Sequence, residues 1–143
     1  MTGRSPVAFG HTGPMAIDLE HPGDDVLGFL RDRHLATLTT LRADGSPHVV
    51  PVGFGYSPDD HVVRIITFAG SQKAANAERG GRAAVSQVEG GRWLTLEGEC
   101  RLVTDRDRVA AAVAAYTARY QAPRERDDRV AIEIRVDRMM GRG

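Results

Sequence analysis

The chain has 143 residues, a length that predicts one domain large enough to bury a hydrophobic core. Its 19 acidic and 19 basic residues balance, so no overall field directs it toward nucleic acid or an anionic membrane surface. A single cysteine, Cys100, excludes an intrachain disulfide and fits a reducing, cytoplasmic environment, and the sequence has no apolar run of the roughly 18 residues that a membrane helix needs.

The first 22 residues are rich in Gly, Pro, His and Ser and show no hydrophobic period. We expect residues 1–22 to form a flexible tail, and they lack the apolar segment of a signal peptide. The alternative is that Met15 and Ile17 join the edge of a strand. Residues 23–143 are expected to form the folded, cofactor-binding domain.

The spacing of apolar residues predicts the elements of that domain. Helices are predicted at residues 22–34, at residues 71–80, and from the N-cap Thr104 to just before Pro123. Segments rich in β-branched residues with a period of two predict strands at 35–41, 47–56, 61–69, 82–88, 92–103 and 129–136.

Turn signals indicate that these strands form antiparallel hairpins. Asp44-Gly45 lies between two strand-like runs and is a strong hairpin signal. Pro51 in the returning run favours an edge position or a bulge, because proline donates no ladder hydrogen bond. With helices inserted between the hairpins, the pattern predicts an α+β fold, mainly β, built on a small barrel.

The stretch GSQK, residues 70–73, stands where a strand ends and a helix begins. Unpaired N–H groups at a helix start attract anions, and the Ser71 hydroxyl with the Lys73 ammonium would complete a phosphate site. The same residues also make an ordinary helix start with a serine N-cap, and the local sequence alone favours that interpretation. Arg64 leaves two alternatives as well, since it either points outward from its strand or shares the anion with Lys73.

Other candidate side chains are less informative. Trp93 is the one tryptophan, and a lone tryptophan more often packs in a core or an interface than stacks on a planar ligand. Gln87 could contact the polar edge of a ligand ring. His34, His48 and His61 lack metal-ligand spacing, and the sequence has no Ser-His-Asp triad, P-loop or Rossmann fingerprint. We therefore expect no metal site and chemistry carried by a bound cofactor.

Two long runs resemble a known family. RHLATLTTLRADGSPHVVPVGF (33–54) and RIITFAGSQKAANAERGGRAAVSQVEGGRWLTLEG (64–98) are similar to the split β-barrel flavin and deazaflavin oxidoreductases, the pyridoxamine-phosphate-oxidase-like superfamily. The resemblance covers residues 25–140. Within the superfamily, the chain most resembles the actinobacterial enzymes that use coenzyme F420.

The resemblance implies a set of cofactor-binding residues. Residues 70–73 would hold the phosphate with help from Arg64, and residues 49–52 would line one side of the ring system. In homodimers of this kind the cofactor lies at the subunit interface, so Gln87 and Trp93 would reach the partner's cofactor. The implied set is Val49, Val50, Pro51, Val52, Arg64, Thr67, Gly70, Ser71, Gln72, Lys73, Gln87 and Trp93.

The activity implied is hydride transfer from reduced F420 to a conjugated acceptor, with biliverdin, reduced to bilirubin, as the favoured one. Two alternatives stay open: an FMN-dependent oxidoreductase on the same fold, and a non-catalytic protein that binds a cofactor or haem. The sequence identifies no catalytic proton donor.

Overall fold

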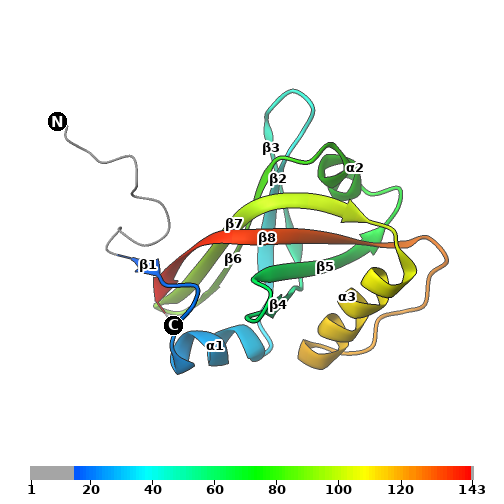
Figure 1. Ribbon diagram of the computed structural model, residues 1–143. Helices are drawn as coiled ribbons and strands as arrows, with labels where there is room; N and C mark the ends of the chain where they lie inside the picture. The colour runs from blue at the N-terminus through cyan, green and yellow to red at the C-terminus, as the bar shows by residue number, and fades with distance from the viewer. Residues whose placement is uncertain (1–14, 143) are drawn as a thin grey trace.

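The computed structural model describes residues 15–142. Its strands form one antiparallel sheet that curls around a hydrophobic core, and three helices pack against this sheet (Figure 1). Its eight strands lie in the order β3-β2-β6-β7-β8-β5-β4, with β1 paired to β8. The strands are β1 (Ala16–Ile17), β2 (Ala36–Leu41), β3 (Pro47–Val52), β4 (Gly55–Ser57), β5 (Val62–Phe68), β6 (Arg82–Glu89), β7 (Arg92–Val103) and β8 (Arg129–Arg142). The helices are α1 (Asp24–Arg31), α2 (Gln72–Arg79) and α3 (Arg106–Arg119). The predicted α+β, mainly β split barrel is confirmed.

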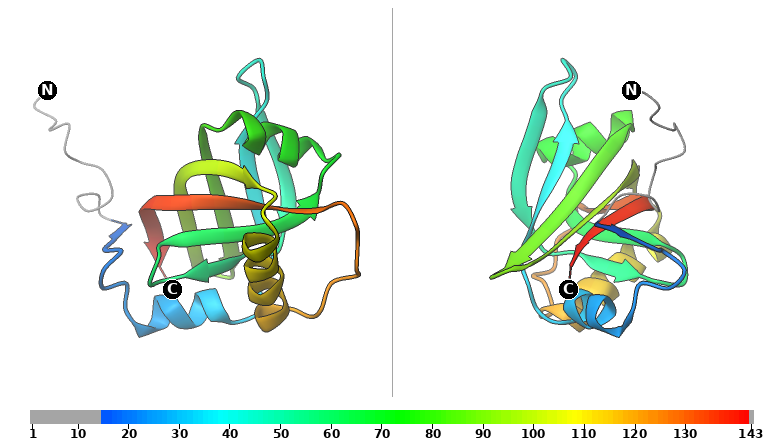
Figure 2. Two further views of the ribbon diagram at one scale, coloured as in Figure 1. Left: turned by 45° about the vertical axis from the view of Figure 1, so that its right-hand side comes forward. Right: turned by 90° about the vertical axis from the view of Figure 1, so that its left-hand side faces the viewer.

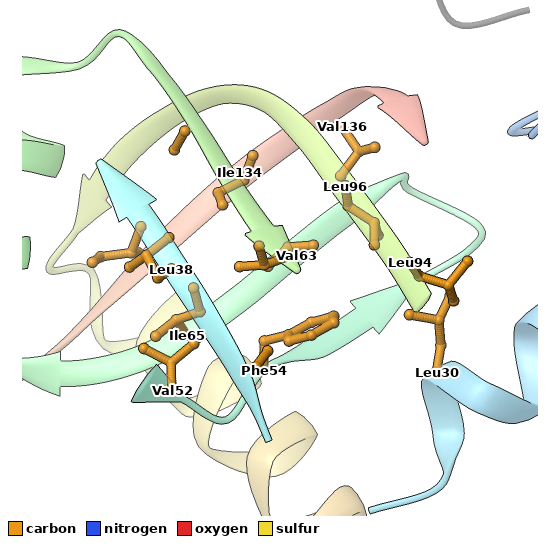
Figure 3. Close-up of a cluster of buried hydrophobic side chains, with 14 of the residues drawn as sticks. Leu30, Leu38, Val52, Phe54, Val63, Ile65, Leu94, Leu96, Ile134 and Val136 are labelled. Atoms are coloured by element: carbon orange, nitrogen blue, oxygen red, sulfur yellow. The ribbon is translucent and has the colours of Figure 1, made fainter. Parts of the chain in front are cut away.

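Inward-facing side chains of alternating residues fill the barrel. Leu38 of β2 is fully buried between two less buried neighbours, as a period of two requires. Figure 3 shows it gathered with Phe54, Ile65 and other apolar side chains of the core. Burial of each such side chain stabilises the fold by about 1.5–3 kcal/mol relative to exposure. The pattern that predicted the strands therefore also builds the core.

The hairpin predicted at Asp44-Gly45 is confirmed. It joins β2 to β3, and Gly45 has φ 86°, a conformation that favours glycine. The Asp44 carboxylate accepts hydrogen bonds from the Ser46 backbone N–H at 2.9 Å and from its hydroxyl at 2.6 Å. The predicted edge position of Pro51 is confirmed too, because β3 pairs with β2 and ends the strand order.

The run predicted as one strand over residues 47–56 is two strands, β3 and β4, separated at Gly53 and Phe54. An added Cβ at Gly53 would lie 2.9 Å from Cε2 of Tyr120 and 3.0 Å from Cε2 of Tyr116. The chain thus changes direction where the end of α3 packs directly on its backbone. The packing of α3, a helix distant in the sequence, therefore interrupts the strand at Gly53, and the local sequence pattern does not reveal this contact.

β8 is longer than the predicted 129–136 and runs between β5 and β7 to Arg142. The β7–β8 ladder shifts register between Glu97 and Gly98, and an added Cβ at Gly98 would lie 1.8 Å from the Arg135 carbonyl oxygen. Glycine is therefore required where the two backbones approach at this bulge.

Part of the predicted tail is a strand. Ala16 and Ile17 pair with Met140 and Met139 of β8, and Ile17 packs against the core. The ordered region thus begins before the predicted boundary at residue 23. The rest of the predicted tail, residues 1–14, lies outside the described residues.

The helices cover different parts of the barrel. Figures 1 and 2 show α1 at one end and α2 at the other, beside the β2–β3 hairpin, while α3 packs against β4, β5 and β8. The predicted N-cap of α3 was wrong by one residue: Asp105, not Thr104, caps it and accepts a 2.9 Å hydrogen bond from the backbone N–H of Arg108. The end of α3 and the segment 121–128 then return the chain to β8.

Candidate functional site

A cavity of about 810 Å³ lies where the two edges of the split barrel face each other. Its walls come from the end of β3, the end of β5, the first turn of α2, the end of α3 and the segment that leads to β8. A volume of this size suits a small organic ligand or cofactor. The cavity is thus the candidate site.

Four of the twelve predicted cofactor residues line this cavity. Pro51 and Val52 contribute from β3, Thr67 from β5 and Lys73 from α2. These residues come from two separate parts of the sequence, and the fold brings them to one place. The resemblance predicted this association, and the geometry agrees with it for these four side chains.

Ser71 acts as the N-cap of α2. Its hydroxyl oxygen accepts a 3.1 Å hydrogen bond from the backbone N–H of Ala74 and a 2.9 Å hydrogen bond from the Thr67 hydroxyl. The ordinary helix-start interpretation therefore describes Ser71, and the same contacts fix the first turn of α2 beside β5. Gly70 and Gln72 are exposed next to it, and the Gln72 amide donates to Asn76 at 2.8 Å. Neither Gly70 nor Gln72 lines the cavity.

Lys73 has the properties of an anion ligand. Its side chain is half-buried in the cavity wall and makes no hydrogen bond or ion pair with any residue from 15 to 142. Burial lowers the pKa of its ammonium because no acidic partner offsets the desolvation. Leaving a partly desolvated ammonium unpaired is costly, and a bound phosphate would remove that cost.

Arg64 lies elsewhere. It faces Glu133 directly across the β5–β8 ladder, with 3.7 Å between its Nε and a carboxylate oxygen, and its Nη2 is 3.8 Å from Asp60. Arg101 and Arg108 also donate to the Glu133 carboxylate, at 2.9 and 2.7 Å. Of the two alternatives for Arg64, the outward orientation is the one observed. The structure does not bring Arg64 to the cavity.

Gln87 is also absent from the cavity. Its side chain is only 1% exposed and lies inside the barrel, where its amide donates to the Phe29 carbonyl at 3.0 Å. Its carbonyl oxygen accepts a 2.7 Å hydrogen bond from Arg119. Both the amide nitrogen and the carbonyl oxygen of the Gln87 side chain therefore have partners inside the subunit, which gives this residue a structural role.

The remaining predicted residues lie on either side of the sheet. Val50 packs against the core, whereas Val49 is exposed on the outer face. Trp93 pairs with Val88 across β6 and β7 on that outer face, since its neighbour Leu94 points inward. None of the three lines the cavity within one subunit.

Sequence reasoning missed the far wall of the cavity. Most of the missed lining residues lie at the end of α3 or in the run that follows it: Tyr116, Gln121, Ala122, Pro123, Arg124, Glu125, Arg126 and Arg129. Gly53, Ile66 and Phe68, next to predicted residues of β3 and β5, were missed as well. The charge-rich run PRERDDR was visible after the last helix. Charged runs of this kind usually lie in solvent, so the run alone gave no reason to assign it to a site.

The family is decided by the sequence match. Residues 23–142 match the pyridoxamine 5'-phosphate oxidase family. The chain belongs to this family. Its split barrel and the place of its cavity agree with that membership.

Individual relatives narrow the comparison. Over 118 residues the chain is 54% identical to an F420H(2)-dependent biliverdin reductase of Mycobacterium tuberculosis. The aligned region covers 82% of this chain and 86% of that protein. A solved F420 reductase superposes with a TM-score of 0.64 at 25% identity, over 78% of this chain and 93% of that one. A conserved hypothetical protein of Mycobacterium tuberculosis gives a TM-score of 0.72 at 21% identity, over 89% and 85% of the two chains, and shows likeness of fold.

Two further findings concern membrane-spanning helices and metal-binding groups. No helix between residues 15 and 142 is long and apolar enough to cross a membrane. In the same range, His, Cys, Asp and Glu side chains do not gather in groups of three or more that could hold a metal ion.

Proposed function

We propose that this protein is an F420-dependent reductase that binds its cofactor in the cavity beside α2. The observation that carries the proposal is the half-buried ammonium of Lys73 in the cavity wall, which has no hydrogen-bond or ion-pair partner among residues 15–142, in a chain 54% identical to an F420H(2)-dependent enzyme. A cation left without a partner at a helix start is suited to a phosphate.

The residues of the cavity fit such a group. Lys73 would hold the phosphate through its ammonium group, while Pro51, Val52 and Thr67 would contact the deazaflavin. Bound in its reduced form, F420 supplies a hydride. The contribution of the chain is to bind the cofactor, orient it and exclude water from its covered face, so that proximity lowers the barrier.

The acceptor we propose is biliverdin, the substrate that the name of the relative gives. Reduction to bilirubin adds one hydride and one proton, so one F420H2 should be consumed per bilirubin formed. Purified protein should be mixed with F420H2 and biliverdin, and both absorbance changes followed. Equal amounts of oxidised F420 and bilirubin support the proposal. Bound F420 without turnover would leave the cofactor assignment and remove this acceptor.

We also propose that the protein is a homodimer with the cofactor near the subunit interface. Val49 of β3 and Val88 of β6 are exposed on the outer face of the sheet, with 56% and 67% of their surface accessible, and Leu35, just before β2, is 60% accessible. Covering such a face with a second copy would bury this surface and protect the edge strand β3. Light scattering should give twice the chain mass of 15.5 kDa. Val88→Glu should give monomers, with Val88→Thr as the isosteric control, and a wild-type monomer at micromolar concentration would contradict the dimer.

A further inference from the structure

The segment 121–126, between α3 and β8, lies between two hollows. One side faces the cavity of about 810 Å³, and the other faces a second cavity of about 670 Å³. Figure 2 shows this segment, in orange, standing out from the barrel between the end of α3 and the start of β8. Ala122, Pro123, Arg124 and Arg126 line both cavities, so side chains of this segment are within reach of a ligand in the site.

Positive charge predominates in the first cavity. Its charged lining residues are four cations and one anion: Lys73, Arg124, Arg126, Arg129 and Glu125. Two of these four cations already have hydrogen-bond acceptors within the protein. Arg126 donates to both carboxylate oxygens of Asp128, at 2.8 and 3.1 Å, and Arg129 donates to the backbone carbonyl of Arg124.

The Arg124 guanidinium is not engaged in this way. It makes no hydrogen bond or ion pair within residues 15–142, although it lines the cavity. Lys73, the other unpaired cation, is assigned to the cofactor phosphate. The site therefore contains a second anion-binding group that the cofactor phosphate does not use, and its planar fork of donors suits a carboxylate.

The surroundings of Arg124 favour a conjugated ligand. Phe68 lines the same cavity, and the Arg126 guanidinium covers its ring at 4.4 Å from the centroid. Pro123 adds a second rigid apolar surface beside the guanidinium. Apolar side chains beside a cation that has no partner among residues 15–142 match a molecule with both rings and carboxylates, such as biliverdin with its two propionates.

We propose that Arg124 binds a carboxylate of the acceptor and so determines acceptor specificity. This inference rests on the proposed function, because it assigns the acceptor side of the same site. The other source of carboxylates is the oligoglutamate tail of F420. A flexible polar tail gains little from the apolar wall at Phe68 and Pro123, so we assign Arg124 to the acceptor.

Direct binding tests the assignment without requiring turnover. Dissociation constants for biliverdin, biliverdin dimethyl ester and F420 should be measured by titration calorimetry with wild-type protein, Arg124→Gln and Arg124→Lys. Arg106→Gln is the matched control, since Arg106 is exposed on α3 and lies outside the cavity. We expect Arg124→Gln to weaken biliverdin binding about five- to tenfold, with partial recovery in Arg124→Lys. F420 affinity should stay within about twofold.

The ester separates a carboxylate contact from a change in shape. Wild-type protein should bind the dimethyl ester about five- to tenfold more weakly than biliverdin, and Arg124→Gln should lower ester affinity no further. Unchanged biliverdin affinity in Arg124→Gln, or weakened F420 affinity with biliverdin unaffected, would overturn the assignment. Absence of biliverdin binding to wild type would overturn it too. Arg124-dependent binding without turnover would support it and contradict the proposed activity instead.

Discussion

Arg119 donates a 2.7 Å hydrogen bond to Oε1 of Gln87, which joins the last turn of α3 to β6 through the inside of the molecule. The same guanidinium donates to the backbone carbonyls of Asp32, Phe54 and Phe29, at 2.8, 2.8 and 3.3 Å. Burial lowers the pKa of Arg119, which nevertheless stays charged near neutral pH. The buried guanidinium of Arg119 thus fixes the end of α3 through hydrogen bonds to neutral oxygen atoms. Because the end of α3 lines the cavity, these bonds also fix one of its walls.

Arg119→Met should therefore destabilise the protein. The substitution removes the donor from four hydrogen bonds and leaves the buried side-chain oxygen of Gln87 without its donor, although the Phe29 carbonyl keeps its bond from the Gln87 amide. We expect the free energy of unfolding to fall by about 2–4 kcal/mol. Urea denaturation measures this, with Arg106→Met as the exposed control on the same helix. A loss below about 0.5 kcal/mol would show that the network does not hold α3.

Lys73→Ala should weaken F420 binding about tenfold while leaving stability almost unchanged. The side chain is half-buried and has no polar partner within the described residues, so its removal breaks no internal hydrogen bond or ion pair. The lost contact is a charge-assisted bond to phosphate, partly screened by solvent. Lys73→Arg, which keeps the charge, should retain most of the affinity. Equal F420 affinity in wild type and Lys73→Ala would contradict the phosphate assignment.

Binding of F420 should also depend on pH through Lys73. Burial lowers the pKa of this ammonium, and only the protonated form attracts phosphate. Affinity should be full below the lowered pKa and should fall as the pH rises through it, at a lower pH than for an ordinary lysine. The opposite sign applies to stability, because the unfolded chain binds this proton more tightly and the free energy of unfolding rises across the same window. A pH series of dissociation constants tests this, and the decline should be absent in Lys73→Ala.

Glu133→Gln should destabilise the outer face of the sheet. The carboxylate is buried, and Arg101 and Arg108 donate to it while Arg64 faces it across the ladder. Its neutralisation removes the anion that these three guanidinium groups share, at a cost of about 2 kcal/mol. Asp137→Asn, which breaks an exposed pair with Arg82, should cost less than about 1 kcal/mol. Thermal unfolding of both variants compares them, and equal shifts would contradict the special role of Glu133.

Local features were predictable from the sequence and long-range ones were not. Asp44-Gly45 specifies its hairpin through backbone conformation, and Ser71 caps α2 within four residues, so both signals lie close together in the chain. Gln87 contacts Arg119, 32 positions away, and nothing in either neighbourhood indicates the pair. The ion-pair partner of Arg64 was not evident either, because Glu133 is still more distant in the sequence.

The candidate site shows the same division. Pro51, Val52, Thr67 and Lys73 were assigned through the resemblance of their two runs to a family, and the cavity brings these four together. The wall that carries Arg124 was not assigned. Its position depends on how the end of α3 packs against Gly53, a contact between residues more than sixty positions apart.

The central claim is that the cavity beside α2 holds F420 through Lys73, and a titration of two cofactors tests it most directly. Wild-type protein and Lys73→Ala should each be titrated with F420 and with FMN, and dissociation constants obtained from fluorescence. We expect F420 to bind wild type more tightly than FMN, and Lys73→Ala to lose about tenfold in F420 affinity. FMN binding tighter than F420 by more than about tenfold, or F420 binding that does not depend on Lys73, would contradict the account.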